Sequence, residues 1–338
     1  MLHEEVRYEP PPVSTYPFKI AAKRYWLPQF ESNIGSPGAL TLVFLHSTSF
    51  HKETWEPTLE CLFELLANQK KVVVREAWAI DCPNHGVAAV LNQALLQDPK
   101  YSNQFTCEKY ACAAHAFLTS GPVDFRHRNL VGIGHSLGGV AMTILQCKQP
   151  AVRFSSVILV EPMLSPHGMD HLAELRRSLV QSARRRQFLW ESRDSAIRSF
   201  ERSRERAASR GRRAWHPKVV QLYIEYGLRP CRDGYTLSCT REEEIAMYED
   251  KDGSTKPVKC LDEACRRLPI HLMLGEFPDY IPKAVQDALS SGRTFASRRT
   301  ILGAGHLVPQ EVPEELAKHL FETLITYPPD PRHIQSRL

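Results

Sequence analysis

One serine stands in a setting typical of a catalytic nucleophile. Residues 134–138, Gly-His-Ser-Leu-Gly, directly follow an apolar run at 129–133 and overlap a helical pattern at 137–146. In a strand–turn–helix arrangement of this kind, a sharp turn lifts the serine hydroxyl clear of the backbone, and small flanking residues permit the turn. We therefore predict that Ser136 is a nucleophile and that the amide of Leu137 points at the developing oxyanion. The alternative is a tight turn whose serine only caps the helix.

A histidine near the end of the chain is the candidate base. Gly-Ala-Gly-His at 303–306 directly follows the last predicted strand, 297–302. A serine hydroxyl is a weak nucleophile at neutral pH and needs an adjacent base. His306 follows Ser136 in the sequence and lies on a loop at the carboxyl end of a strand. The other thirteen histidines are weaker candidates, and His135 would face away from the site if Ser136 faces it. We predict that His306 takes the serine proton, the alternative being a loop histidine with no special role.

Apolar runs and helical patterns alternate along most of the chain and indicate the elements that must position these residues. The predicted buried strands lie at 39–46, 71–80, 129–133, 156–160, 269–274 and 297–302. Helical patterns lie at 87–97, 107–118, 137–146, 282–289 and 314–326. Strands that alternate with helices indicate an α/β fold with a mostly parallel sheet covered by helices on both faces.

The alternation breaks once, between residues 162 and 268. This stretch contains no convincing core strand and has helical patterns at 171–186, 190–208 and 216–226. It is too long for a plain loop in a compact domain. We predict a hydrolase core at 1–161 and 269–326, an inserted helical cap at 162–268 and a flexible tail at 327–338. The cap should lie over the carboxyl ends of the strands, where open α/β sheets bind ligands.

The cap carries an excess of positive charge. Between Arg176 and Arg213 there are thirteen arginines and four acidic residues, whereas the whole chain has a formal net charge of +5. One interpretation is a solvated helix face with internal pairing. The other is attraction of an anionic substrate, such as the phosphates of coenzyme A. Charge alone would also permit nucleic-acid binding, but no nucleic-acid-binding module is recognisable, so we expect none.

The cysteines and the first residues favour an intracellular protein. The nine cysteines are scattered, and neither Cys107 and Cys112 nor Cys260 and Cys265 have the spacing of a zinc knuckle. We expect reduced thiols, no metal and no organic cofactor. The first thirty residues lack the apolar stretch of a secretory signal, and no apolar run reaches membrane-spanning length.

A further motif makes the fold resemblance specific. Asp-Cys-Pro-Asn-His-Gly at 81–86 resembles the D-x-P-G-H-G turn of α/β hydrolases, with asparagine in place of one glycine. Together with the serine turn and the Gly-x-Gly-His segment, the resemblance covers nearly all of the chain outside the cap. The stretches 44–55, 160–162 and 223–229 are similar to fungal secondary-metabolite hydrolases, of the AK-toxin biosynthesis type and the mycophenolic acid acyl-CoA hydrolase type.

The resemblance implies a second oxyanion donor. In α/β hydrolases the loop after an early strand supplies this amide, and here that loop is His-Ser-Thr-Ser at 46–49. By position we choose the amide of Thr48, with Ser47 next. The alternative is a polar turn that leads into a helix near Trp55.

Two carboxylates compete for the role of the triad acid. Many members of the fold place the acid after the penultimate strand, where Asp279 stands one residue later than the usual Gly-x-x-Asp spacing. Members that resemble the mycophenolate hydrolase carry it where Glu161 stands, at the end of the strand after the nucleophile's strand. Either could orient the imidazole and stabilise its charged form. We favour Glu161, with Asp279 as the alternative acid.

The last three residues resemble a cellular address. Ser336, Arg337 and Leu338 form a tripeptide of the Ser-Lys-Leu type that a peroxisomal import receptor reads, and the fungal hydrolases named above are often peroxisomal. We therefore predict a peroxisomal location, and otherwise a cytoplasmic one.

The sequence thus predicts a serine hydrolase with a small-molecule acyl thioester or ester as substrate. We favour a bulky acyl-CoA of secondary-metabolite or toxin biosynthesis, cleaved through an acyl-enzyme on Ser136. A carboxylesterase acting on a neutral metabolite is one alternative, and a non-catalytic binding protein of the same fold is another. The assembly stays open, with a homodimer as one option.

Overall fold

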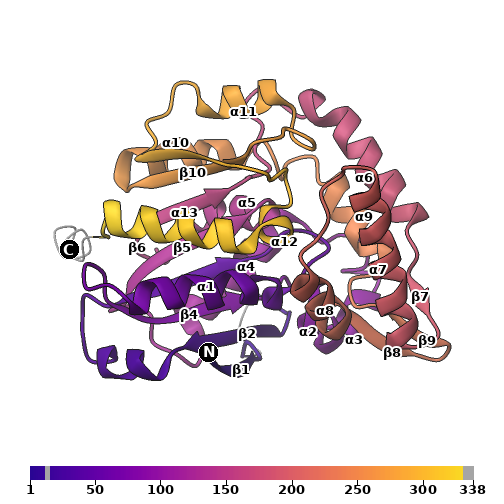
Figure 1. The fold of residues 1–338 in the computed structure, drawn as a ribbon, viewed down its shortest axis with the longest axis horizontal. Coiled ribbons are helices and arrows are strands. Elements are labelled where there is room, and N and C mark those ends of the chain that lie inside the picture. The colour runs from indigo at the N-terminus through magenta and orange to yellow at the C-terminus, as the bar shows by residue number, and fades with distance from the viewer. Residues whose placement is uncertain (12–15, 330–338) are drawn as a thin grey trace.

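An eight-stranded sheet forms the centre of the protein (Figure 1). The structure is a computed structural model that describes residues 1–11 and 16–329. In sheet order the strands are β1 (Leu2–Tyr8), β2 (Ile20–Trp26), β4 (Val74–Ile80), β3 (Leu40–Leu45), β5 (Asn129–His135), β6 (Phe154–Val160), β10 (Ile270–Gly275) and β11 (Ser297–Ile301). Strand β2 is antiparallel to both of its neighbours, and all the other pairs are parallel.

The six predicted strands are confirmed, with ends that shift by up to three residues. Every residue of β3, β5 and β6 is buried, as expected for parallel strands that are covered on both faces. The two strands at the N-terminal edge were not predicted. Strand β1 is mostly exposed and polar, so it lacks the apolar run that marks the other strands.

Helices cover both faces of the sheet. Helices α1, α12 and α13 contribute to the core on one face, and α4, α5 and α10 to the core on the other. The helices that follow or precede core strands are α1 (Glu56–Ala67), α2 (Gly86–Leu91), α3 (Gln93–Gln97), α4 (Cys107–Ser120), α5 (Leu137–Leu145), α10 (Pro257–Arg267), α11 (Lys283–Ser290), α12 (Val308–Glu311) and α13 (Pro313–Thr326). Short 3-10 helices lie at η1 (Pro28–Asn33), η2 (Lys52–Trp55) and η3 (Asp170–Leu172). No described helix combines the length and the apolar character needed to cross a membrane.

A large insertion separates β6 from β10. It contains α6 (Ala173–Arg185), α7 (Arg193–Ser209), α8 (Pro217–Tyr226) and α9 (Arg241–Glu249), which stand together at one end of the sheet in Figure 1. It also contains a separate sheet of β7 (Leu189–Trp190), β9 (Gly234–Leu237) and β8 (Leu228–Cys231), which the helical patterns did not predict. Helix α10 lies within the range 162–268 but packs with α5 in the core cluster.

The register of the parallel strands brings their carboxyl ends to one edge. Leu45 pairs with Gly134, Val160 pairs with both His135 and Met273, and the last residues of β10 and β11 also pair. The loops that follow β3, β5, β6, β10 and β11 therefore begin at nearly the same level. This is the edge at which open α/β sheets bind their ligands, and it carries the residues predicted from the sequence.

Candidate active site

Ser136 occupies a sharp turn between β5 and α5. Its backbone has φ 53° and ψ −113°, a conformation that costs a non-glycine residue about 1–3 kcal/mol. The flanking glycines permit close packing there: a Cβ on Gly138 would lie 2.0 Å from the carbonyl oxygen of Leu45, and a Cβ on Gly134 would lie 2.4 Å from that of Gly138. The turn is thus held tightly against the end of β3.

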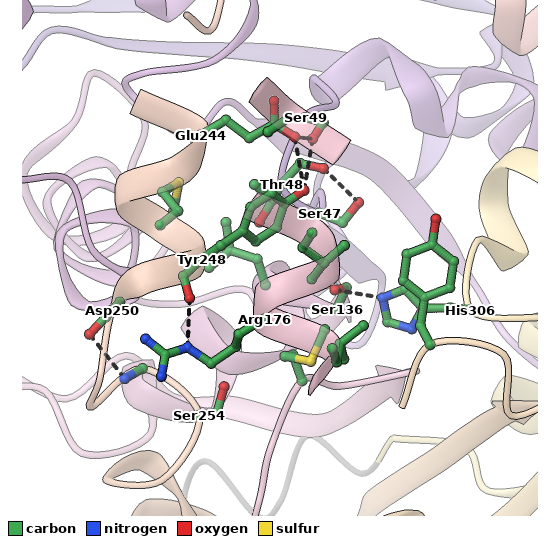
Figure 2. Close-up of a pocket in the computed structure, with 18 of the residues that line it drawn as sticks. Ser47, Thr48, Ser49, Ser136, Arg176, Glu244, Tyr248, Asp250, Ser254 and His306 are labelled. Atoms are coloured by element: carbon green, nitrogen blue, oxygen red, sulfur yellow. Dashed lines mark hydrogen bonds between the residues drawn. The ribbon is translucent and has the colours of Figure 1, made fainter. Parts of the chain in front are cut away.

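The imidazole of His306 lies against the Ser136 hydroxyl. The distance from His306 Nε2 to Ser136 Oγ is 2.9 Å (Figure 2). The ring of Tyr280 stacks on the imidazole, with 5.2 Å between centroids and 20° between planes. His306 follows β11 on a loop at the carboxyl edge of the sheet, and only 3% of it is exposed. The ring is therefore confined to one position beside the serine.

His135 supports this loop from behind the turn. Burial lowers the pKa of His135 to about 3, so its ring is neutral at physiological pH. Its Nε2–H donates to the carbonyl oxygen of His306, with 2.8 Å between the two atoms. His135 thus contacts the backbone of His306, a contact that the sequence did not reveal.

Glu161 contacts the other side of the His306 ring. Its Oε2 lies 3.0 Å from His306 Nδ1, while its Oε1 accepts from the Gly275 amide at 2.7 Å and from Gln286 Nε2 at 3.2 Å. Glu161 follows β6 directly and is 1% exposed. A carboxylate at this place selects the tautomer in which Nδ1–H donates to Glu161, so Nε2 is free to accept the serine proton.

Gln286 is a hydrogen-bond partner of Glu161 that sequence analysis missed. It lies on α11, is 4% exposed and donates to the Glu161 carboxylate. A buried glutamine inside a helical pattern carries no signal of its own, because nothing in the pattern tells which face of the helix meets Glu161.

Asp279 contacts the backbone of His306 rather than its ring. Its Oδ1 accepts from the His306 amide at 2.8 Å, and its Oδ2 forms an ion pair with Arg213 of the insertion. Arg213 Nε also lies 3.2 Å from Glu311 Oε2, and this oxygen accepts from the Gly305 amide at 2.8 Å. The two rival carboxylates therefore both reach His306, but the imidazole itself is contacted by Glu161.

The loop after β3 lies beside Ser136 and is held by two buried histidines. Ser47, Thr48 and Leu137 line the same cavity as Ser136. His46 Nε2 accepts from the Cys82 amide at 2.9 Å, and His85 Nε2 accepts from the Ser49 amide at 2.9 Å. The motif at 81–86 thus helps to fix this loop. In the described parts of the chain, neither the Leu137 amide nor the Thr48 amide donates to another backbone carbonyl.

The cavity next to Ser136 is largely apolar. It has a volume of about 240 Å³ and lies between the carboxyl edge of the sheet and the insertion. Its apolar lining comes mainly from α6, α9 and the segment after β6, and includes Val140, Met163, Met169, Leu172, Leu175, Leu179 and Met247. Polar side chains gather at places away from the serine, as Figure 2 shows for Arg176 and Glu244.

Two of the thirteen arginines between 176 and 213 line this cavity, Arg176 and Arg186. Arg186 forms an ion pair with Glu244, which also accepts from Tyr248 Oη at 2.9 Å. Arg193 donates instead to the carbonyls of Ile224 and Glu225, at 2.9 and 3.0 Å. Most of the arginines between 176 and 213 therefore do not line the cavity.

The sequence matches a known protein family and is similar to two curated fungal proteins. The model of the Alpha/beta hydrolase family matches residues 42–319. Among curated proteins, the type I acyl-CoA thioesterase mpaH of Penicillium roqueforti (strain FM164) is 28% identical over 217 residues, which cover 62% of this chain and 44% of that protein. The abhydrolase domain-containing protein ACTT2 of Alternaria alternata is 29% identical over 126 residues, which cover 35% of this chain and 44% of that protein. The matched regions span less than half the length of both relatives.

A solved structure resembles the whole chain. The peroxisomal alpha-beta-hydrolase Lpx1 of Saccharomyces cerevisiae superposes with a TM-score of 0.71 at 18% sequence identity, over 100% of this chain and 90% of that one. At this identity the likeness concerns the fold alone. Together with the family match, it confirms the fold class expected from the sequence.

Proposed function

The chain belongs to the alpha/beta hydrolase family, and we propose that it is a serine hydrolase that cleaves a thioester or ester. The observation that carries this proposal is the continuous chain of contacts from Ser136 through His306 to Glu161. His306 Nε2 lies 2.9 Å from Ser136 Oγ, and His306 Nδ1 lies 3.0 Å from Glu161 Oε2. This arrangement is that of a nucleophile, a base and an orienting carboxylate.

The proposed reaction has two steps. Ser136 Oγ attacks the substrate carbonyl while His306 Nε2 takes its proton, and Glu161 stabilises the imidazolium. The amides of Leu137 and Thr48 bind the oxyanion. The carbon–sulfur or carbon–oxygen bond then breaks, and His306 returns the proton to the leaving group. A water molecule, deprotonated by His306, releases the acid from the acyl-enzyme and regenerates the Ser136 hydroxyl.

For the substrate, we favour a bulky acyl-CoA of secondary-metabolite or toxin biosynthesis. A relative named as an acyl-CoA thioesterase supports this choice, as does the apolar lining of the cavity beside Ser136. A carboxylesterase acting on a neutral metabolite is the second candidate. It is favoured by the observation that only two of the thirteen arginines between 176 and 213 line the cavity.

The rates at which thioesters and an ester of one acid are hydrolysed separate these candidates. We expect kcat/KM to be higher for the CoA thioester than for the N-acetylcysteamine thioester and the ethyl ester of the same acid. The advantage over the N-acetylcysteamine thioester should shrink as salt rises, because exposed charges are screened within about 10 Å at 0.1 M ionic strength. Neutralising the exposed pair Arg184 and Arg185 together should have the same effect as salt.

The surface charge has no role if salt and this double substitution change kcat/KM equally for the CoA thioester and the N-acetylcysteamine thioester. Preference for the ethyl ester would place the carboxylesterase first. Arg193→Gln serves as a control, because the Arg193 guanidinium donates to the backbone carbonyls of Ile224 and Glu225.

We also propose that the protein is imported into peroxisomes. The tripeptide Ser336 to Leu338, which lies outside the described residues, supports this location because it resembles the Ser-Lys-Leu signal. Removal of residues 336–338 should move a fluorescently tagged protein from peroxisomes to the cytosol without loss of catalysis. An unchanged distribution after truncation would show that the tripeptide is incidental.

A further inference from the structure

One end of the cavity beside Ser136 is marked by an arginine. Arg176 lies on α6, and Figure 2 shows its guanidinium on the side of Asp250 and Ser254, away from the contact between Ser136 and His306. Its Nε donates to the carbonyl of Tyr248 at 2.9 Å, and its Nη2 donates to the carbonyl of Glu249 at 3.0 Å. These two bonds fix the plane of the guanidinium while leaving other N–H groups available.

The charge of Arg176 is not balanced by a side chain. Within the described residues its hydrogen bonds go to neutral carbonyls, and it forms no ion pair. The nearby carboxylate of Asp250 is occupied by backbone amides, since it accepts from Asp252 and Gly253 through Oδ1 and from Cys107 through Oδ2, each at 3.1 Å. Arg186, the other arginine of the cavity, does have a carboxylate partner in Glu244. Arg176 is therefore a positive group that lines the cavity and has no ion pair with a carboxylate among the described residues.

We propose that Arg176 binds a carboxylate at the far end of the acyl group of the substrate, so that the preferred substrates are ω-carboxyacyl thioesters or esters. This inference rests on the proposed hydrolase function. A guanidinium whose plane is already fixed suits a carboxylate, which it can bind through two parallel hydrogen bonds. The apolar residues of the lining would contact the methylene chain between the two ends.

The size of the cavity favours a carboxylate of the acyl group over a phosphate of coenzyme A as this anion. Its volume of about 240 Å³ is below the roughly 300–1,000 Å³ of pockets for drug-sized ligands. An acyl group fits such a space, whereas the carrier and the acyl group together do not. The anion that reaches Arg176 should accordingly belong to the acyl part.

The test compares acyl groups that differ only at their far end. Mono-thioesters of dicarboxylic acids, from glutaric to sebacic acid, are paired with fatty acyl thioesters of equal length, each on coenzyme A and on N-acetylcysteamine. We expect a preference for one length of ω-carboxyacyl group on both carriers. Arg176→Met should raise KM for that substrate by about 10- to 100-fold, the usual effect of losing a hydrogen bond to a charged group, and leave kcat nearly unchanged.

Two variants serve as controls for this experiment. Arg176→Lys keeps the charge without the planar fork and should restore part of the affinity. Arg177→Met changes the adjacent arginine, whose side chain is 72% exposed and does not line the cavity, and should leave the preference intact. The paired fatty acyl thioesters report any structural damage, because they cannot bind Arg176 through a carboxylate.

The outcomes that contradict the proposal differ from those that contradict the hydrolase function. If Arg176→Met weakens every CoA thioester equally and spares the N-acetylcysteamine thioesters, the bound anion is a phosphate of the carrier. If it weakens carboxylated and plain acyl groups alike on both carriers, Arg176 only supports the backbone near Tyr248. Absence of hydrolysis of every thioester and ester by the wild-type protein would instead remove the proposed function itself.

Discussion

Purified Ser136→Ala should hydrolyse the substrate at least about 10³-fold more slowly than the wild-type protein, as triad deletions do in other serine hydrolases. The reason is that no other hydroxyl is placed within 2.9 Å of His306 Nε2 in the described structure. The measurement is kcat on a thioester or ester that the wild-type protein hydrolyses. A fluorophosphonate probe should label the wild-type protein covalently and should fail to label the variant.

Ser182→Ala is the matched control for this prediction. Ser182 lines the same cavity but has no contact with His306, so its loss should leave both turnover and labelling close to those of the wild-type protein. Near-normal turnover in Ser136→Ala would reject the acyl-enzyme mechanism. Absence of probe labelling in the wild-type protein would favour a binding protein that uses the same fold without catalysis.

Glu161→Gln should lower kcat by about 10²- to 10⁴-fold, whereas Asp279→Asn should lower it by less than about 10-fold. The Glu161 carboxylate accepts from His306 Nδ1, the Gly275 amide and Gln286 Nε2. A glutamine cannot accept through both of its ends, so its amide group would oppose one of these donors. The hydrogen bond that selects the reactive tautomer of His306 would then be weakened or lost.

Asp279→Asn is expected to be milder because the Oδ1 that accepts from the His306 amide remains. The substitution removes the charge opposite Arg213, but that pair is partly exposed, with 29% and 27% of the two side chains accessible, and such pairs contribute little to stability. Both variants should be compared at equal folded fractions, measured by circular dichroism. A larger loss of kcat in Asp279→Asn than in Glu161→Gln would assign the acid to Asp279.

The parallel part of the sheet could be predicted because strands that are buried on both faces contain continuous apolar runs. Every residue of strands β3, β5 and β6 is buried, and each strand contains an apolar run. The glycines around Ser136 mark a turn that few other residues could form. Strands β1 and β2 carry no comparable pattern. Their pairing depends on contacts between distant parts of the chain, which local periodicity does not encode.

Only part of the candidate site could be predicted from the sequence. Ser136 and His306 stand in recognisable local motifs, whereas the choice between Glu161 and Asp279 depends on which carboxylate reaches the imidazole ring. That choice is made by the packing of strand ends and of Gln286. The cavity arginines were likewise indistinguishable in the sequence, because the rotation of α6 decides that Arg176 faces the cavity while Arg177 faces solvent.

The ion pair between Arg213 and Asp279 has a consequence for protein engineering. Arg213 belongs to the insertion and Asp279 to the core, and Asp279 also holds the main chain of His306. The insertion is therefore not an independent module that can be exchanged without regard to its host. A chimera that receives the insertion of another hydrolase would leave Asp279 and Glu311 without their cationic partner unless it keeps an arginine at the place of Arg213.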